Sequence, residues 1–312
     1  MNTPNDTPSE VLVGRLFQRI GEVSSLPVVA LQIIDVANDP MACSDDLLDA
    51  VRLDAALAAR IMRTVNSSYY ALRSKVEELK MAITLLGFKE IRNLAITAYV
   101  AQLFKESEGY GTYDRRGLWN HLIGAGSVAR LIADYSGQVP PREAYLAGLL
   151  HDIGLILLDQ YLHEPFCRVV DKLSPDEDST AAETELLGFD HTELGGYVML
   201  QWKLPEYLAA TAIHHHRPEL YTGEHRKIVC AVALANFFCN LKGVTSLGVA
   251  NTTMPETEIF AELNLGKPQV AEIWNRLDEV FESANLMALM QGEEDGEGPQ
   301  HPAADFQEMP AM

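Results

Sequence analysis

Apolar side chains recur along this chain at spacings of three and four residues, the periodicity of helices that bury one face. In the first third of the chain, this pattern and its capping residues predict helices over residues 11–20, 27–38, from 44 onward, 54–66, 77–86 and 88–104. In the remainder they predict a helix over 118–135, one that starts at 141 and continues through the apolar run 144–158, and a short one that ends near 187. Further helices are predicted over 190–202, 205–216, 226–241, 256–263 and 268–290. No stretch alternates apolar and polar residues for long enough to form a convincing strand. The pattern therefore predicts an all-α fold.

Residues with strong backbone preferences mark the ends of these segments. Ser44 and Asp54 are expected N-caps, because their side-chain oxygens accept hydrogen bonds from the free N–H groups of a first helical turn. Asp190 and Glu193 form a capping-box pattern at the start of a later helix. Gly137 is expected to end the helix before it.

A polar, glycine-bearing segment at residues 106–117 is expected to connect two helical lobes. The last residues are rich in Glu, Asp, Gly and Pro, a composition typical of disorder. The expected parts are a disordered arm (1–9), one domain (10–290) made of an N-terminal helical lobe (10–110), a second lobe (111–245) and C-terminal helices (246–290), and a disordered acidic tail (291–312).

The charge balance narrows the expected partners. The formal net charge is −20, from 24 Lys and Arg against 44 Asp and Glu. Because nucleic-acid binding depends mainly on neutralising phosphates, we expect no nucleic-acid partner. No run approaches the roughly 18 apolar residues needed to cross a bilayer, and residues 1–10 lack the features of a secretion signal. We expect a soluble, cytoplasmic protein with no membrane partner.

The spacing and surroundings of the cysteines are consistent with a cytoplasmic location. They show no C-x-x-C spacing and lie in apolar or mixed helical contexts. We therefore expect buried free thiols in a reducing compartment at all four positions, Cys43, Cys167, Cys230 and Cys239.

The candidate chemistry lies in the second lobe. Five of the nine histidines fall on inward helix faces or at helix ends there, together with an aspartate: His121, His151, Asp152, His191, His215 and His216. A single buried histidine is more often a satisfied core residue than a ligand. The set as a whole offers imidazole and carboxylate, which favour Fe, Mn, Ni or Zn over Mg. A buried carboxylate such as that of Asp152 also needs a metal ion or hydrogen bonds to offset its desolvation. Asn236 places an amide on the apolar stripe of helix 226–241.

The order of these residues resembles the HD-domain phosphohydrolase superfamily and its HD-GYP phosphodiesterase branch. Motifs of the first lobe and of the later helices are similar to the HDOD domain, the HD-related output domain of bacterial signalling. The resemblance covers roughly residues 15–245. Its motifs are LP (26–27), NDP (38–40), RLDAAL (52–57), NSSY (66–69), AI (82–83) with LG (86–87), WKLP (202–205) and HHRP (215–218).

The resemblance implies an HD-like second lobe and a ligand set for one or two divalent transition-metal ions. The superfamily's metal ligands would fall on His121, His151, Asp152, His191, His215 and His216. Asp152 would bridge two ions and serve the hydrolysis of a phosphate ester. The chain also departs from the pattern at two positions. The family's final Asp falls on Asn236, the seventh candidate ligand, whose amide oxygen can still coordinate a metal ion but brings no negative charge, and the HD-GYP lysine falls on Leu155. The Gly-Tyr-Pro signature is replaced by residues 217–221.

Three functions are compatible with these features. The first is a signal-transduction domain of weak or no activity that retains the metal as a structural or sensing element. The second is an active metal-dependent phosphohydrolase acting on a nucleotide or a cyclic dinucleotide. The third is an interaction scaffold whose histidines are ordinary core residues. The expected partner is another signalling protein or a small phosphorylated ligand, and the residues do not decide between them.

Overall fold

The structure is a computed structural model that describes residues 13–14, 27–66, 74–104, 109–174, 179–250 and 253–292. Side chains of the last helix are described up to residue 284. The arm expected at residues 1–9 lies outside the described residues. So do the helix expected at 11–20, apart from residues 13 and 14, and residues 293–312 of the expected tail.

The N-terminal lobe is built from short helices whose ends largely follow the capping pattern. Asp54 accepts a hydrogen bond from the Leu57 N–H at 2.9 Å, as expected of an N-cap, and Gly87 ends a helix with φ +80°. The elements are α2 (Val28–Asn38), α3 (Ser44–Arg52), α4 (Ala55–Val65), α5 (Leu79–Leu86), α6 (Phe88–Val100) and the 3₁₀ turn η1 (Ala101–Phe104).

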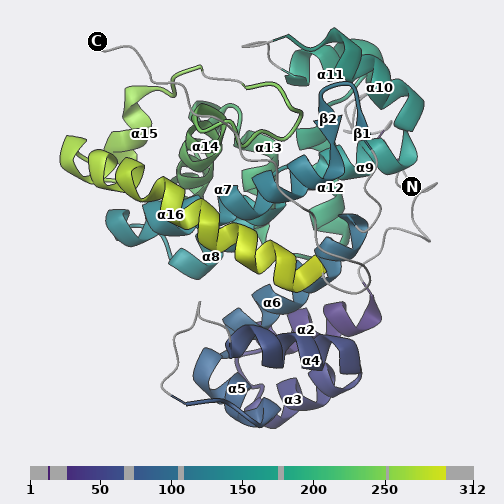
Figure 1. Cartoon of the computed structure of the whole chain (residues 1–312), viewed down its shortest axis with the longest axis vertical. Helices are drawn as coiled ribbons and strands as arrows, with labels where there is room; N and C mark the ends of the chain where they lie inside the picture. The colour runs from purple at the N-terminus through teal and green to yellow at the C-terminus, as the bar shows by residue number, and fades with distance from the viewer. Residues whose placement is uncertain are drawn as a thin grey trace, which may run out of the picture.

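The second lobe and the C-terminal helices are also α-helical, which confirms the all-α prediction. In Figure 1 the long α16 crosses the face of this lobe over α7, and the N-terminal lobe lies below. The elements are β1 (Gly109–Tyr110), β2 (Tyr113–Asp114), α7 (Arg115–Ser136), α8 (Pro141–Leu150), α9 (Ile153–Tyr161), α10 (His163–Lys172), α11 (Ser179–Leu187), α12 (His191–Gln201), α13 (Glu206–His214), the 3₁₀ turn η2 (Pro218–Leu220), α14 (Arg226–Leu241), α15 (Thr257–Glu262) and α16 (Lys267–Gly292).

Two predicted helix starts are wrong, and one short hairpin was not predicted. Ser44 is the first residue of α3 rather than its cap, because the Asp46 carboxylate accepts the Cys43 N–H at 2.7 Å and closes the turn one residue earlier. The connecting segment contains a small antiparallel hairpin, β1–β2, too short to produce an alternating pattern. Asp114 then caps α7, which therefore starts at Arg115 instead of residue 118.

The apolar run 144–158 is also not one continuous helix. It is divided between α8 and α9, and the two residues at the division are His151 and Asp152. Asp152 has φ −101° and ψ 19°, and its side chain does not cap α9. The division aims two polar side chains in one direction, which a continuous helix would not do, since neighbouring residues lie about 100° apart around its axis.

Helix α6 lies between the two lobes (Figure 1) and is buried on every side from Glu90 to Val100. Its polar side chains find partners on both sides. Arg92 donates to Asn38 Oδ1 of the N-terminal lobe at 2.9 Å, and Asn93 donates across the boundary to the Arg142 carbonyl at 2.8 Å. The two lobes therefore share part of one core.

The cysteine prediction holds for three positions and is wrong for one. Cys167, Cys230 and Cys239 are buried free thiols, but Cys43 is exposed because it precedes α3 in the loop at the edge of the lobe. Among the helices that the structure describes, none is long and apolar enough to cross a membrane.

Candidate metal centre

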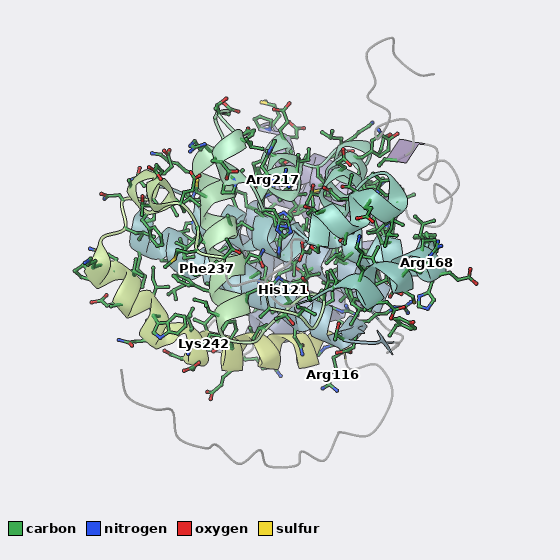
Figure 2. All side chains as sticks on the ribbon, turned by 90° about the horizontal axis from the view of Figure 1, so that it is seen from above. Arg116, His121, Arg168, Arg217, Phe237 and Lys242 are labelled. Atoms are coloured by element: carbon green, nitrogen blue, oxygen red, sulfur yellow. The ribbon has the colours of Figure 1, made fainter. Side chains whose placement is uncertain are left out.

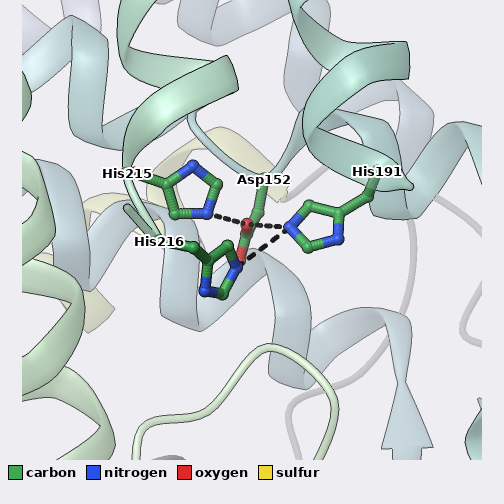
Figure 3. Close-up of side chains that lie close together, drawn as sticks. All are labelled: Asp152, His191, His215 and His216. Atoms are coloured by element: carbon green, nitrogen blue, oxygen red, sulfur yellow. Dashed lines mark hydrogen bonds and ion pairs between the residues drawn. The ribbon is translucent and has the colours of Figure 1, made fainter. Parts of the chain in front are cut away.

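Four separate parts of the second lobe bring six of the seven predicted site residues together. His121 comes from the middle of α7, and His151 and Asp152 come from the α8–α9 junction. His191 is the first residue of α12, and the remaining two histidines follow the end of α13. Figure 3 shows His191, His215 and His216 converging on Asp152.

The approach of α7 to α8 depends on two glycines. A Cβ on Gly148 would lie 2.8 Å from the Ala125 carbonyl oxygen, and a Cβ on Gly126 would lie 2.8 Å from the Tyr145 carbonyl oxygen. Both distances are shorter than ordinary van der Waals contact, so only glycine allows the two backbones to come this close. The close approach places the imidazole of His121 next to that of His151.

The two carboxylate oxygens of Asp152 face different histidines. Oδ2 lies 3.3 Å from His151 Nε2 and 3.6 Å from His121 Nε2. Oδ1 lies 3.2 Å from His191 Nε2 and 3.1 Å from His215 Nε2. On the second side, His216 Nε2 lies 3.2 Å from His191 Nε2. The carboxylate thus divides the imidazoles into two groups.

Hydrogen bonds from Nδ1 orient the rings toward Asp152. His121 donates to the Val244 carbonyl at 2.8 Å, and His151 donates to the Gly148 carbonyl at 2.7 Å. His215 donates to the Ala212 carbonyl at 2.9 Å. Because a carbonyl only accepts, Nδ1 carries the hydrogen in each ring, and in the neutral ring Nε2 presents a lone pair to the centre.

The fourth ring is held by Glu183 on α11, a residue that the sequence analysis did not single out. Its carboxylate is fully buried and accepts the His191 Nδ1–H at 2.7 Å and the His191 backbone N–H at 2.6 Å. A carboxylate behind a ligating histidine fixes the ring and raises its basicity. The only sequence signal was an acidic residue on a short helix with no clear apolar face.

Burial and neighbouring charges shift the pKa values of these groups in opposite directions. Burial, together with the charge of His151, lowers the pKa of His121 to about 4. Burial also lowers the pKa of His215 and, with the charge of His215, that of His216. Burial opposes the ionisation of Asp152, but the charge and hydrogen bond of His151 outweigh it and hold its pKa well below the ordinary value.

His191 behaves differently from the other imidazoles. Burial opposes its protonation, but the Glu183 charge on one side and the hydrogen bond to Asp152 on the other raise its pKa well above the ordinary value. The two carboxylates thus favour the protonated form of His191, whereas burial favours the neutral form of His121, His215 and His216.

The geometry fits metal ions. His215 Nε2 is buried and has no hydrogen-bond partner, which is costly unless a cation satisfies it. His121 Nε2 and His151 Nε2 lie 3.4 Å apart, so in the neutral rings two lone pairs face each other. The ligand atoms form two sets that share Asp152, one with His121 and His151 and the other with the three remaining histidines. Imidazole nitrogen and carboxylate oxygen are ligands for Fe, Mn, Ni or Zn.

Asn236, the seventh predicted residue, lies nearby on α14. Its side chain lines the same cavity as His215 and His216, and its Oδ1 accepts a hydrogen bond from Asn240 at 2.9 Å. Its role as a ligand stays a prediction. Leu155, at the position of the HD-GYP lysine, is fully buried in α9.

A cavity of about 350 Å³ opens beside the His/Asp cluster. His215 and His216 form part of its wall, and the rest comes from the end of α10, the start of α11, η2, α14, α15 and the connections around α14 and α15. The volume is that of a site for a small molecule.

The fold and the cluster define an HD-like helical protein. The HDOD domain matches residues 23–218, and the chain belongs to the HDOD family. A protein of Treponema pallidum (strain Nichols) is 22% identical over 237 residues, which cover 75% of this chain and 45% of that protein. This chain thus spans less than half the length of that relative.

Solved structures agree with this assignment. An HDOD domain protein from Geobacter sulfurreducens is 26% identical with a TM-score of 0.73, over 89% of this chain and 98% of that one. A protein from Marinobacter aquaeolei VT8, named for signal transduction, is 28% identical with a TM-score of 0.75, over 91% of this chain and 64% of that one. A Shewanella amazonensis SB2B protein, named as a metal-dependent phosphohydrolase, shares the fold at 17% identity and a TM-score of 0.56. The match covers 88% of this chain and 98% of that one.

Proposed function

We propose that this chain is a regulatory domain of bacterial signal transduction whose second lobe holds one or two divalent transition-metal ions. The observation that carries the proposal is the placement of Asp152, whose two oxygens face separate groups of imidazoles at 3.1–3.6 Å. Membership of the HDOD family and the Marinobacter neighbour named for signal transduction support the regulatory part.

Each residue has a defined task in this proposal. His121 and His151 would hold one ion, and His191, His215 and His216 would hold the other. Asp152 would bridge them, and Glu183 would keep His191 in position. When bound, divalent ions act as Lewis acids and lower the pKa of coordinated water. The backbone carbonyls behind the rings hold Nε2 ready for a ligand role.

The surroundings favour regulation over efficient hydrolysis. Leu155 provides no charge where a phosphate clamp would be needed, and Asn236 provides no negative charge to an ion. Among the described residues that line the cavity, none is a lysine or an arginine. Loss of such groups removes several kcal/mol of transition-state stabilisation, at about 3–4 kcal/mol for a single well-placed donor.

Metal analysis tests the proposed centre. The purified full chain, produced in medium supplemented with Fe, Mn, Ni and Zn, is expected to carry a transition metal, and Asp152→Asn is expected to lose most of it. Asp278→Asn, a substitution at an exposed ion pair with Lys242, is the control for charge. A metal-free wild-type chain, or equal occupancy in Asp152→Asn, would contradict the proposal.

The Asn236→Asp variant tests the seventh position in the same measurement. Restoring a carboxylate at the edge of the centre should raise metal occupancy or affinity, because an anionic oxygen binds a divalent ion more strongly than an amide oxygen. Equal occupancy would mean that residue 236 is not part of the centre.

An active phosphohydrolase is the second candidate, because the cavity opens directly beside two of the candidate ligands. The metal-loaded chain should be assayed with a cyclic dinucleotide and with a chromogenic phosphomonoester. We expect no turnover at enzyme-like rates. Turnover that disappears in Asp152→Asn would replace the regulatory proposal with the hydrolase.

A further inference from the structure

The cavity beside the cluster has a distinctive distribution of charge. Among the described residues that line it, the two ionisable side chains apart from the histidines are both carboxylates, Glu219 on η2 and Glu256 just before α15. The other polar groups are amides and hydroxyls, and the apolar part includes Phe237 and Met254. The polar neutral residues are Ser174, Ser179, Asn236, Asn240, Ser246 and Thr253.

Arg226, a cation near this cavity, is engaged by other groups. Arg226 donates to the carbonyls of Pro218 and Tyr221 at 3.1 and 2.6 Å, and its Nε lies 3.7 Å from Glu262. In Figure 2, Arg116 and Arg168 lie at the periphery of the molecule, whereas His121 lies near the middle. A cleft lined by one sign of charge also concentrates the field of the whole molecule, which here has a net charge of −20.

One part of the cavity wall would attract negative charge rather than repel it. His215 is 2% exposed, and its Nε2, which has no hydrogen-bond partner, belongs to the set of atoms around Asp152 that could hold a metal ion. A metal ion at that point would attract one anionic group of a ligand. The remainder of the ligand would then lie among amides, hydroxyls and the two carboxylates.

We propose that this cavity selects a small ligand with a single anionic group, bound at the metal centre, and a neutral or positively charged remainder. A second negative charge would face Glu219 and Glu256, and none of the described residues that line the cavity is a lysine or an arginine. This inference rests on the proposed metal centre and adds the class of ligand that the centre recognises. Compounds with two or more separate phosphates, cyclic dinucleotides included, are the class that the cavity disfavours.

The test is a calorimetric titration of the metal-loaded full chain with three monophosphates that differ in the charge of the remainder. Phosphoethanolamine has a positively charged remainder, glycerol 3-phosphate a neutral one and 3-phosphoglycerate a negative one. We expect affinity to fall in that order, by about tenfold between the first and the last, as for charges that interact across a partly solvated site. Equal affinities, or tighter binding of 3-phosphoglycerate, would overturn the inference.

Substitutions test whether Glu219 and Glu256 cause the difference in affinity among the three monophosphates. The double variant Glu219→Gln, Glu256→Gln should bring the three affinities within about threefold of one another, since it removes both carboxylates. Glu258→Gln is the matched control, because Glu258 is exposed on α15 and does not line the cavity. A preference that persists in the double variant would show that these carboxylates do not cause it.

Two further measurements separate this inference from the proposed function. Elemental analysis of the same samples reports whether the metal centre exists, independently of any ligand. Inorganic phosphate, which has no remainder, reports whether the centre takes an anion. A metal-loaded chain that binds neither inorganic phosphate nor any of the three probes would overturn the inference and leave the metal centre in place.

Discussion

At the level of single residues, two buried carboxylates act on opposite sides of the same imidazole. Asp152 faces Nε2 of His191, and Glu183 accepts the hydrogen of its Nδ1. The first is a candidate ligand, and the second is a positioning residue that reaches a metal ion only through the ring. The difference can be measured, because the two carboxylates should affect proton release and metal content differently.

Glu183→Gln keeps the size of the side chain and removes its charge. We expect the pKa of His191 to fall toward its ordinary value and metal affinity to drop by about 10–100-fold, the usual effect of losing a carboxylate behind a ligating histidine. Competition with a chromophoric chelator measures the affinity. Calorimetry in buffers of different ionisation enthalpy should show that metal binding releases fewer protons at pH 7 than in the wild type.

The control is Glu185→Gln on the same helix, where the side chain is exposed and pairs with Lys172. Its metal affinity should equal that of the wild type. Unchanged affinity in Glu183→Gln would show that the His191 ring is held without this carboxylate.

The sequence predicted the positions of the histidines better than that of Glu183, the residue that holds one of them in place. His121 could be placed from the apolar face of its helix, and His191 from the capping box that precedes it. Glu183 could not be placed, because α11 has almost no apolar face to orient it. Its contact with His191 also depends on the turn that joins α11 to α12, where Gly188 has φ +83°.

At the level of helices, the division between α8 and α9 is what points His151 and Asp152 toward one centre. The periodicity could not predict it, because α8 and α9 are buried on nearly all sides and the apolar pattern continues across the junction. The structure places Gly154, in the first turn of α9, against the first residue of α12. A Cβ at this position would overlap the carbonyl oxygen of His191.

Gly154→Ala should therefore push α12 away from α9 and separate His191 from Asp152. We expect a loss of stability of about 1–3 kcal/mol, as for an overpacked core, and weaker metal binding. Gly195→Ala is the matched control, since a Cβ there would meet its neighbours at 3.4 Å or more, which is ordinary contact. Urea unfolding and metal titration of both variants check the prediction, and equal behaviour would refute it.

Helix α4 offers an acid-dependent test of the N-terminal lobe. Burial opposes the ionisation of Asp54, but the Leu57 N–H and the Tyr99 hydroxyl outweigh it and lower its pKa. Because the folded state then binds the proton less readily than the unfolded state, the stabilisation is present above the ordinary pKa of 3.8 and is lost as the pH falls below it.

Asp54→Ala should cost about 1 kcal/mol at pH 7, the usual loss of an N-cap, and less at pH 3. Asp49→Ala, at a largely exposed position, should change stability little at either pH. Urea unfolding at the two pH values gives the comparison. An Asp54→Ala deficit that is the same at pH 3 and pH 7 would show that the carboxylate charge is not responsible.

At the level of the whole molecule, the candidate centre connects α7, the α8–α9 junction, α12 and the end of α13. A ligand that binds only the folded state stabilises it by mass action, by about 2.7 kcal/mol for one site at a free concentration of 100 times Kd. Chelation of the metal-loaded chain should therefore lower Tm by several degrees. Hydrogen exchange should become faster in α12 and α13 and change little in α3 and α5.

Asp152→Asn serves as the control for that experiment, since chelator should not change its Tm. A wild-type Tm that is insensitive to chelator, in a sample shown to contain metal, would mean that the ions do not hold these helices together.

Helix α6 sets the limits within which this chain can be divided. Its surface from Glu90 to Val100 is covered on one side by the N-terminal helices and on the other by α8. A fragment that stops at residue 110 would expose to water the side that α8 covers, and a fragment that starts at 111 would leave an apolar face of α8 bare. Neither half would be a self-sufficient folding unit.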